Sequence, residues 1–186
     1  MRRLIRTGVL TAMCLAAGVQ ARADAFVNPW AGVNFGSDIN EGRASFGVGA
    51  GWMGAGIIGG EAVFGYSPSF FGTDNDFGNN TVIDFMGNVI VGIPIGGQRG
   101  GGFRPYVTGG LGLLRTQIDG GTVFNVKTSD NDLGWNAGAG AMGFFNDHFG
   151  VRGDIRYLRN LTGNSINHLD LGDLKFWRLS AGVVIR

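Results

Sequence analysis

The stretch "VRGDIRYLRN" (151–160) carries a charged side chain at every second position, namely Arg152, Asp154 and Arg156. Successive side chains of a β-strand point to opposite faces of the sheet, so these three charges share one face. The residues between them are small, aliphatic or aromatic. We therefore expect a strand with one charged face and one apolar face. The Arg-Gly-Asp tripeptide falls in the middle of this strand, whereas an adhesion motif must be exposed on a loop, so we interpret it as a chance match.

The same alternation with a period of two recurs along most of the chain. It is clear in "FGVGAGWM" (46–53), "LGWNAGAGAMG" (133–143) and "WRLSAGVVIR" (177–186). Alternation sustained over such lengths indicates strands and not helices. Eight strands are expected, at residues 27–37, 43–53, 56–68, 80–94, 103–117, 132–144, 148–160 and 174–186.

The expected connections between these strands are of two kinds. One kind is mostly tight or rich in glycine, at residues 54–55, 95–102 and 145–147. The other kind is on average longer and more polar, at residues 38–42, 69–79, 118–131 and 161–173. An even number of strands, with short turns at one end and long loops at the other, is typical of a barrel that spans a membrane. The sequence therefore predicts an all-β fold, an eight-stranded antiparallel up-and-down transmembrane β-barrel.

The first 23 residues have the layout of a secretory signal peptide. Arginines precede an apolar run from Gly8 to Gly18, and Ala21-Arg22-Ala23 supplies the small residues of a cleavage site. We expect cleavage after Ala23, which leaves residues 24–186 as one barrel domain. The apolar run is too short for a spanning helix, which needs about 20 residues. The single cysteine, Cys14, lies in this segment, so no disulfide is expected in the remaining domain.

Two features indicate that the apolar face of the barrel points outward, toward lipid. The expected strands are long enough to cross an apolar band about 25 Å tall, whereas strands of soluble proteins usually run about 5–6 residues. Aromatic residues also gather toward both strand ends, where rings anchor at membrane interfaces. Near the short-turn end lie Trp30, Trp52, Phe103, Tyr106, Phe144 and Phe149, and nearer the long-loop end lie Phe70, Phe85, Trp135, Tyr157 and Trp177. We expect Trp52 at one membrane interface, and Trp135, Tyr157 and Trp177 at the other.

The opposite face then lines the interior and carries charges of both signs. An outward arginine at the bilayer midplane costs about 2–4 kcal/mol, whereas charges inside the barrel can pair. An eight-stranded barrel is just wide enough for side chains to fill it, so we expect a plugged lumen. The expected lumen charge network comprises Glu61, Asp84, Arg104, Arg152, Asp154, Arg156 and Arg178. The glycines expected to leave room for the long arginines are Gly47, Gly49, Gly51, Gly110, Gly112, Gly138 and Gly140.

The charge balance argues against a nucleic-acid partner. The chain carries 15 Lys and Arg against 14 Asp and Glu, and four of the arginines lie in the signal segment. The remaining domain is therefore slightly acidic and lacks the basic patch that nucleic acid requires. No cofactor and no metal site are expected, because the acidic stretch "DNDFG" (74–78) does not match the glycine and glutamate spacing of a calcium loop.

Three segments carry a family resemblance: "PWAGVNFG" (29–36), "RPYVTGGLGLL" (104–114) and "FWRLSAGVVIR" (176–186). Together with the signal segment they resemble the small outer-membrane β-barrel family, which includes the OmpA-type transmembrane domain and OmpX-like and opacity-like surface proteins. The resemblance implies a Gram-negative cell outer membrane, periplasmic termini and insertion by the outer-membrane barrel assembly machinery. The chain departs from the family at its end, where Ile185 and Arg186 replace the usual terminal aromatic residue.

Some barrels of this size are lipid A deacylases, so an enzymatic role is a further possibility. That family carries a His and a Ser two residues apart on a late strand, whereas the corresponding segment here, "YLRNLTGN" (157–164), contains no histidine. His148 and His168 are expected in a turn and a loop, and neither forms a nucleophile–base pair. We therefore expect no enzymatic activity.

The expected loops are acidic, and we interpret them as solvated surface. The alternative is divalent-cation bridging to anionic lipopolysaccharide. The acidic loop residues are Asp38, Glu41, Asp74, Asp76, Asp119, Asp130, Asp132, Asp170 and Asp173.

The resulting interpretation is a monomeric barrel with a plugged polar lumen and a structural or surface-interaction role, surrounded by outer-membrane lipids and lipopolysaccharide. The alternative is a narrow OmpW-like channel for small or apolar solutes. The two differ in the interior, because the first predicts a continuous polar plug and the second an apolar lateral opening.

Overall fold

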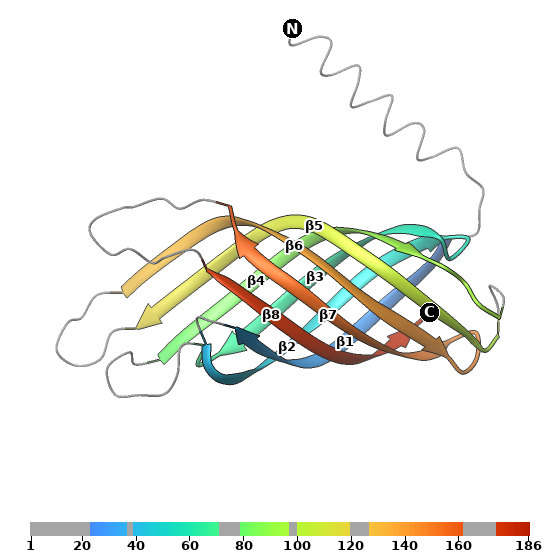
Figure 1. Ribbon diagram of the computed structural model, residues 1–186, viewed down its shortest axis with the longest axis horizontal. Helices are drawn as coiled ribbons and strands as arrows, with labels where there is room; N and C mark the ends of the chain where they lie inside the picture. The colour runs from blue at the N-terminus through green and yellow to red at the C-terminus, as the bar shows by residue number, and fades with distance from the viewer. Residues whose placement is uncertain (1–22, 37–38, 71–78, 97–99, 120–126, 162–173) are drawn as a thin grey trace, which may run out of the picture.

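The computed structural model describes residues 23–36, 39–70, 79–96, 100–119, 127–161 and 174–186, which form a closed antiparallel barrel of eight strands (Figure 1). The strands are β1 (Ala23–Gly36), β2 (Ile39–Gly54), β3 (Ile58–Pro68), β4 (Asn79–Gly92), β5 (Gly102–Asp119), β6 (Lys127–Phe144), β7 (Phe149–Asn160) and β8 (Lys175–Ile185). The predicted fold class is therefore confirmed. Within the described part of the chain, no helix is long and apolar enough to cross a membrane.

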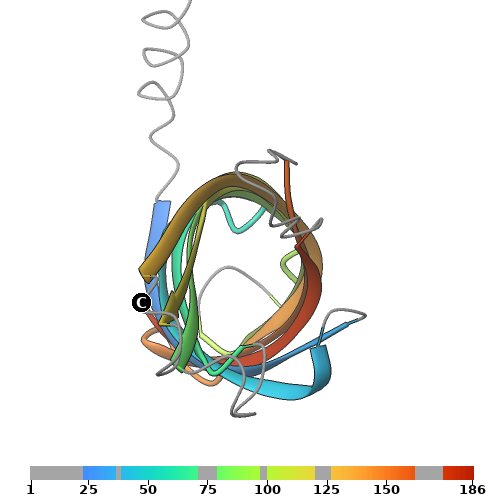
Figure 2. The same cartoon turned by 90° about the vertical axis from the view of Figure 1, so that its left-hand side faces the viewer.

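Each strand pairs with its neighbours in the sequence, and β8 returns to pair with β1. The closing register runs from Val27 opposite Ile185 to Phe35 opposite Trp177. Seen from its end, the sheet forms a continuous ring (Figure 2). Because a closed ring has no edge strand, the backbone groups of the ladder find partners without water, as a bilayer requires.

Three strands begin four or five residues earlier than the sequence predicted. β1 starts at Ala23, β2 at Ile39 and β6 at Lys127, which is five residues before the expected start at residue 132. The β5–β6 ladder continues to the pair Asp119 and Lys127. The residues in this extension are polar and were expected to form a loop. The ladder is built from backbone groups, so polar side chains do not end it where it extends beyond the apolar band.

Burial alternates along the strands with a period of two, as the regular buried and exposed positions of β7 show. The interior is not polar throughout, which corrects the expected continuous polar plug. Two apolar clusters fill its ends. The short-turn cluster comprises Phe26, Met53, Ile90, Tyr106, Met142, Phe144 and Val184. The long-loop cluster comprises Phe70, Val82, Met86, Leu114, Leu158 and Phe176.

The charged side chains lie mainly between these two clusters. Along β8, for example, Arg178 follows Phe176 of the long-loop cluster and precedes Val184 of the short-turn cluster. The alternation predicts which residues face inward, but inward positions of one strand hold both apolar and charged side chains. The separation of the interior into two apolar clusters and a charged section between them depends on the register of neighbouring strands.

Candidate functional site in the barrel interior

Four charged side chains form a compact cluster at the centre of the interior, here called the central quartet: Glu61 of β3 and Arg152, Asp154 and Arg156 of β7. Arg152 donates to both carboxylate oxygens of Glu61, and its Nε lies 3.0 Å from Asp154 Oδ2. Arg156 Nη2 lies 3.1 Å from Glu61 Oε2 and 3.1 Å from Asp154 Oδ2. All four side chains are at most 8% exposed. Each carboxylate oxygen therefore accepts from at least one arginine.

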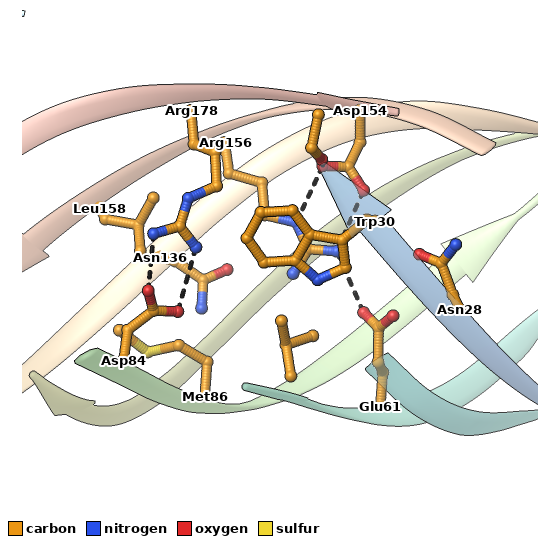
Figure 3. A pocket seen from close by; sticks show the side chains of 12 residues that line it. Asn28, Trp30, Glu61, Asp84, Met86, Asn136, Asp154, Arg156, Leu158 and Arg178 are labelled. Atoms are coloured by element: carbon orange, nitrogen blue, oxygen red, sulfur yellow. Dashed lines mark hydrogen bonds and ion pairs between the residues drawn. The ribbon is translucent and has the colours of Figure 1, made fainter. Parts of the chain in front are cut away.

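The quartet follows directly from strand geometry. Arg152, Asp154 and Arg156 are two residues apart on β7, so all three project inward. Glu61 projects from β3 on the other side of the ring, and the barrel is narrow enough for the two walls to touch. Figure 3 shows Arg156, Asp154 and Glu61 converging beside the indole of Trp30.

Tyr106 of β5 forms hydrogen bonds to two members of the central quartet. The sequence predicted this residue at a membrane interface. Its hydroxyl donates to Asp154 Oδ2 at 2.7 Å and accepts from Arg152 Nε at 2.6 Å. The Arg152 guanidinium also lies 4.8 Å from the centre of the tyrosine ring. Ser180 of β8 donates a further bond to Asp154 at 2.9 Å. Arg104 faces inward and Tyr106 is two residues further along β5, so the period of two predicts that Tyr106 also faces inward.

A second ion pair lies nearer the long-loop end. The guanidinium of Arg178 of β8 donates two hydrogen bonds, of 2.6 and 3.1 Å, to the carboxylate of Asp84 of β4 (Figure 3). The Nε of Arg178 donates to Asn34 at 2.9 Å, and Asn34 in turn donates to Ser67 at 2.8 Å. The guanidinium lies 4.9 Å from the Trp30 ring. The predicted single network is thus divided into the central quartet and this separate pair, because Arg178 reaches the wall of β4 instead of β3.

Arg104, also expected in the network, lies in the short-turn section. Its guanidinium is 3.9 Å from the carboxylate of Asp24, 3.7 Å from the sulfur of Met53 and 5.2 Å from the centre of the Phe144 ring. Arg186 contacts the same carboxylate at 3.4 Å and lies 3.6 Å from the centre of the same ring. Arg104 therefore belongs to a cluster formed by the two ends of the barrel chain, and no direct bond of its described side chain joins the central quartet.

The inward glycines lie beside backbone carbonyls of neighbouring strands and beside side chains that are mostly not arginines. A Cβ at Gly47 would collide with Trp30, and one at Gly112 would lie 2.6 Å from the sulfur of Met86. Among the seven glycines predicted for this role, Gly138 is the one with an arginine side chain, that of Arg156, among its nearest neighbours. The prediction that these glycines leave room for the long arginines is therefore wrong for six of the seven, whose nearest neighbours are other groups.

The space left between these side chains is very small. The central cavity measures about 10 Å³ and is lined by Trp30, Asp154, Arg156 and Arg178 among others. A single water needs roughly 10–15 Å³ of such space. This cavity therefore has room for about one water molecule.

The four aromatic residues expected at the membrane interfaces all lie on the outward face. Trp52 is 51% and Trp177 41% exposed, while Trp135 and Tyr157 are partly exposed. The rings of Trp135 and Tyr157 are 5.6 Å apart, and those of Tyr157 and Trp177 are 5.2 Å apart. These three rings form a row across β6, β7 and β8, called here the aromatic row.

Four further aromatic residues were wrongly expected in the same belts. Their rings point inward: Trp30, Phe70, Tyr106 and Phe144. Position near a strand end does not decide the face of a residue, whereas the period of two does.

The described residues contain no group of three His, Cys, Asp or Glu side chains that could hold a metal ion. Most of the acidic loop residues, interpreted as solvated surface with cation bridging as the alternative, lie outside the described residues, among them Asp74, Asp76 and Asp170. His168 lies outside them as well. His148 is exposed in the turn between β6 and β7.

A family model described as "Outer membrane protein beta-barrel domain" matches residues 7–186. No curated protein sequence matches the chain. Among solved structures, Neisserial surface protein A shares 15% identity and a TM-score of 0.67, with 88% of this chain and 97% of that chain covered.

Two further solved structures have the same fold. The N-terminal β-barrel domain of Pseudomonas aeruginosa OprF has a TM-score of 0.56 at 15% identity, covering 88% of this chain and 96% of that chain. The outer membrane enzyme PagL has a TM-score of 0.50 at 14% identity, covering 86% of this chain and 98% of that chain. Likeness at these identities concerns the fold alone.

Proposed function

Because the chain belongs to the outer-membrane β-barrel domain family, we propose that it is a monomeric barrel with a closed interior and a structural or surface-interaction role. The observation that carries this proposal is the packing of the lumen. The central quartet and the Asp84–Arg178 pair cross the interior, and the cavity between them measures about 10 Å³. A barrel packed in this way offers its outer face and its loops for contact, and not its lumen.

The proposed orientation places the long-loop end toward the cell exterior and both ends of the mature chain in the periplasm. Residues 1–23 would direct export and be removed, and the outer-membrane barrel assembly machinery would insert the domain. The surrounding partners would be outer-membrane lipids and lipopolysaccharide. The support for this orientation is the general layout of such barrels, which have short periplasmic turns and longer extracellular loops.

A narrow OmpW-like channel is less well supported. Such a channel would need an apolar opening through the wall, whereas the β6–β7 ladder is continuous from Gly134 and Asn160 to Phe144 and Gly150. A catalytic role also lacks support, because the described part of the interior contains no histidine and its carboxylates are held by arginines.

Single-channel recording in planar bilayers tests the closed interior. We expect the purified protein to give no steady ionic current, because paired side chains block the lumen at its centre. A 16-stranded porin inserted under the same conditions serves as the positive control. Steady conductance comparable with that of the porin would contradict the proposal.

A further inference from the structure

The outer wall of the barrel has an apolar hollow next to the aromatic row. It lies over β6, β7 and β8, which run side by side in Figure 1. Its volume is about 420 Å³, and its walls include Trp135, Tyr157, Trp177 and Ile155. Its floor is low because β6 contributes only Ala137, Gly138 and Ala139 at this point. The hollow therefore lies over these small residues of β6, between Trp135 of the same strand and the large residues of β7 and β8.

This hollow does not connect with the cavity in the lumen. The β6–β7 ladder beneath it is unbroken, with Ala137 paired to Tyr157 and Ala139 paired to Ile155. An occupant must therefore come from the medium around the barrel. In the outer membrane that medium is lipid, and the apolar walls suit a hydrocarbon chain.

Two basic residues lie directly beyond the aromatic row, toward the long loops. Arg159 of β7 is paired with Lys175 of β8, and the next outward pair along these strands is Tyr157 with Trp177. Outward residues two apart on a strand are separated by about 7 Å, so the cations lie one step beyond the rings of Tyr157 and Trp177. Arg159 also pairs with Trp135 of β6. From the loop end inward, this face presents cations, then aromatic rings, then the hollow.

We propose that this face binds one molecule of lipopolysaccharide, with an acyl chain in the hollow and a lipid phosphate at Arg159 and Lys175. The order of groups matches that of a lipid, whose anionic head lies outside its apolar chain. Arginine and lysine are the usual protein partners of phosphate. The choice of lipopolysaccharide rests on the proposed orientation, because the long-loop end then lies in the outer leaflet that this phosphate-bearing glycolipid occupies.

Native mass spectrometry of the folded protein in neutral detergent tests the site, with deep-rough lipopolysaccharide, phosphatidylglycerol and phosphatidylcholine as separate probes. We expect one retained lipopolysaccharide and weaker retention of both phospholipids. Arg159→Gln and Lys175→Gln should each weaken binding by about fivefold, the usual effect of one interfacial basic residue. Ala137→Phe, which fills the hollow, should weaken binding as well.

Two matched control variants separate the site from general effects of charge and size. Arg115→Gln removes an exposed arginine on β5, and Ala62→Phe enlarges an exposed alanine on β3. Both lie outside the hollow, so neither should change binding. Equal losses in the controls, unchanged binding in the site variants, or equal retention of phosphatidylglycerol would overturn the proposal.

The orientation has its own test, so the two proposals can fail separately. A Lys175→Cys variant should react with a membrane-impermeant maleimide on intact cells. Reaction only after the outer membrane is broken would overturn the orientation and the choice of lipopolysaccharide with it. A conducting barrel that still retains one lipopolysaccharide would contradict the closed lumen and leave this site standing.

Discussion

At the scale of single residues, Asp154 accepts hydrogen bonds from four different side chains of the described interior. The donors are Tyr106, Arg152, Arg156 and Ser180. A buried charge is costly unless a partner compensates it, so removing this acceptor leaves arginines without part of their counter-charge. Ile155, the next residue along β7, is 39% exposed on the outward face and makes no such contacts.

We predict that Asp154→Ala lowers the free energy of unfolding by about 3 kcal/mol or more, the range for breaking a buried ion pair. Ile155→Ala should cost less, because its lipid contacts are partly retained. The double variant Asp154→Ala with Arg156→Ala should cost less than the sum of the two single changes. Reversible unfolding in lipid vesicles measures all of these. A silent Asp154→Ala beside a severe Ile155→Ala would mean that the two faces are assigned the wrong way round.

At the scale of the strand, each element carries two chemically different faces, and its ends mark two depths. Trp52 lies at the short-turn end of β2, whereas Trp135 and Trp177 lie in the parts of β6 and β8 nearer the long loops. Trp30 differs from all three, because it points into the lumen beside Arg178.

We predict that quenching by lipids brominated at different depths sorts single-tryptophan variants into two interfacial layers. Trp135 and Trp177 should lie in one layer, with Tyr157 packed between them, and Trp52 in the other, as expected for aromatic belts. A variant that keeps only Trp30 is the matched control and should be quenched least. Deep quenching of Trp135 or Trp177 at the bilayer centre would contradict the topology.

The alternation of the sequence predicted the barrel and the inward face of the seven charged residues, because a period of two is a local property. It did not predict which charges meet. That depends on register, which pairs Gly138 with Arg156 and Arg156 with Arg178, and on contacts across the lumen between β3 and β7. Tyr106 lies near a strand end, which favours a membrane interface, but it is two residues from the inward Arg104 and therefore faces the interior. The start of β6 was missed because its first residues resemble a loop in composition.

At the scale of the whole molecule, the two ends of the described chain are fastened together at the short-turn end. The backbone N–H of Arg186 donates to His148 O at 2.9 Å, and its side chain donates to Asn146 O at 3.2 Å. The same guanidinium reaches Asp24 of β1 at 3.4 Å and lies 3.6 Å from the centre of the Phe144 ring. This one residue thus connects β1, β6 and the turn before β7.

We predict that Arg186→Ala lowers the free energy of unfolding by about 1–2 kcal/mol, the size of a largely desolvated cation–π contact. Arg186→Lys should fall between this variant and the unchanged protein, because lysine keeps the charge and loses the planar fork. Arg115→Ala on the exposed face of β5 is the control and should have little effect. Equal stability of Arg186→Ala and the unchanged protein would show that the fastening is not energetically important.

The pairing of β8 with β1 has a consequence for how the molecule is made. The side chain of Asn28 donates to the carbonyl of Val183, 155 residues further along the chain. Contacts of such separation raise the contact order and slow folding, because a long loop must close before they form. Until β8 pairs with β1, these two strands are open edges that can pair with another chain. Pairing of the last strand with the first is therefore the step that turns a sheet with two open edges into a closed ring.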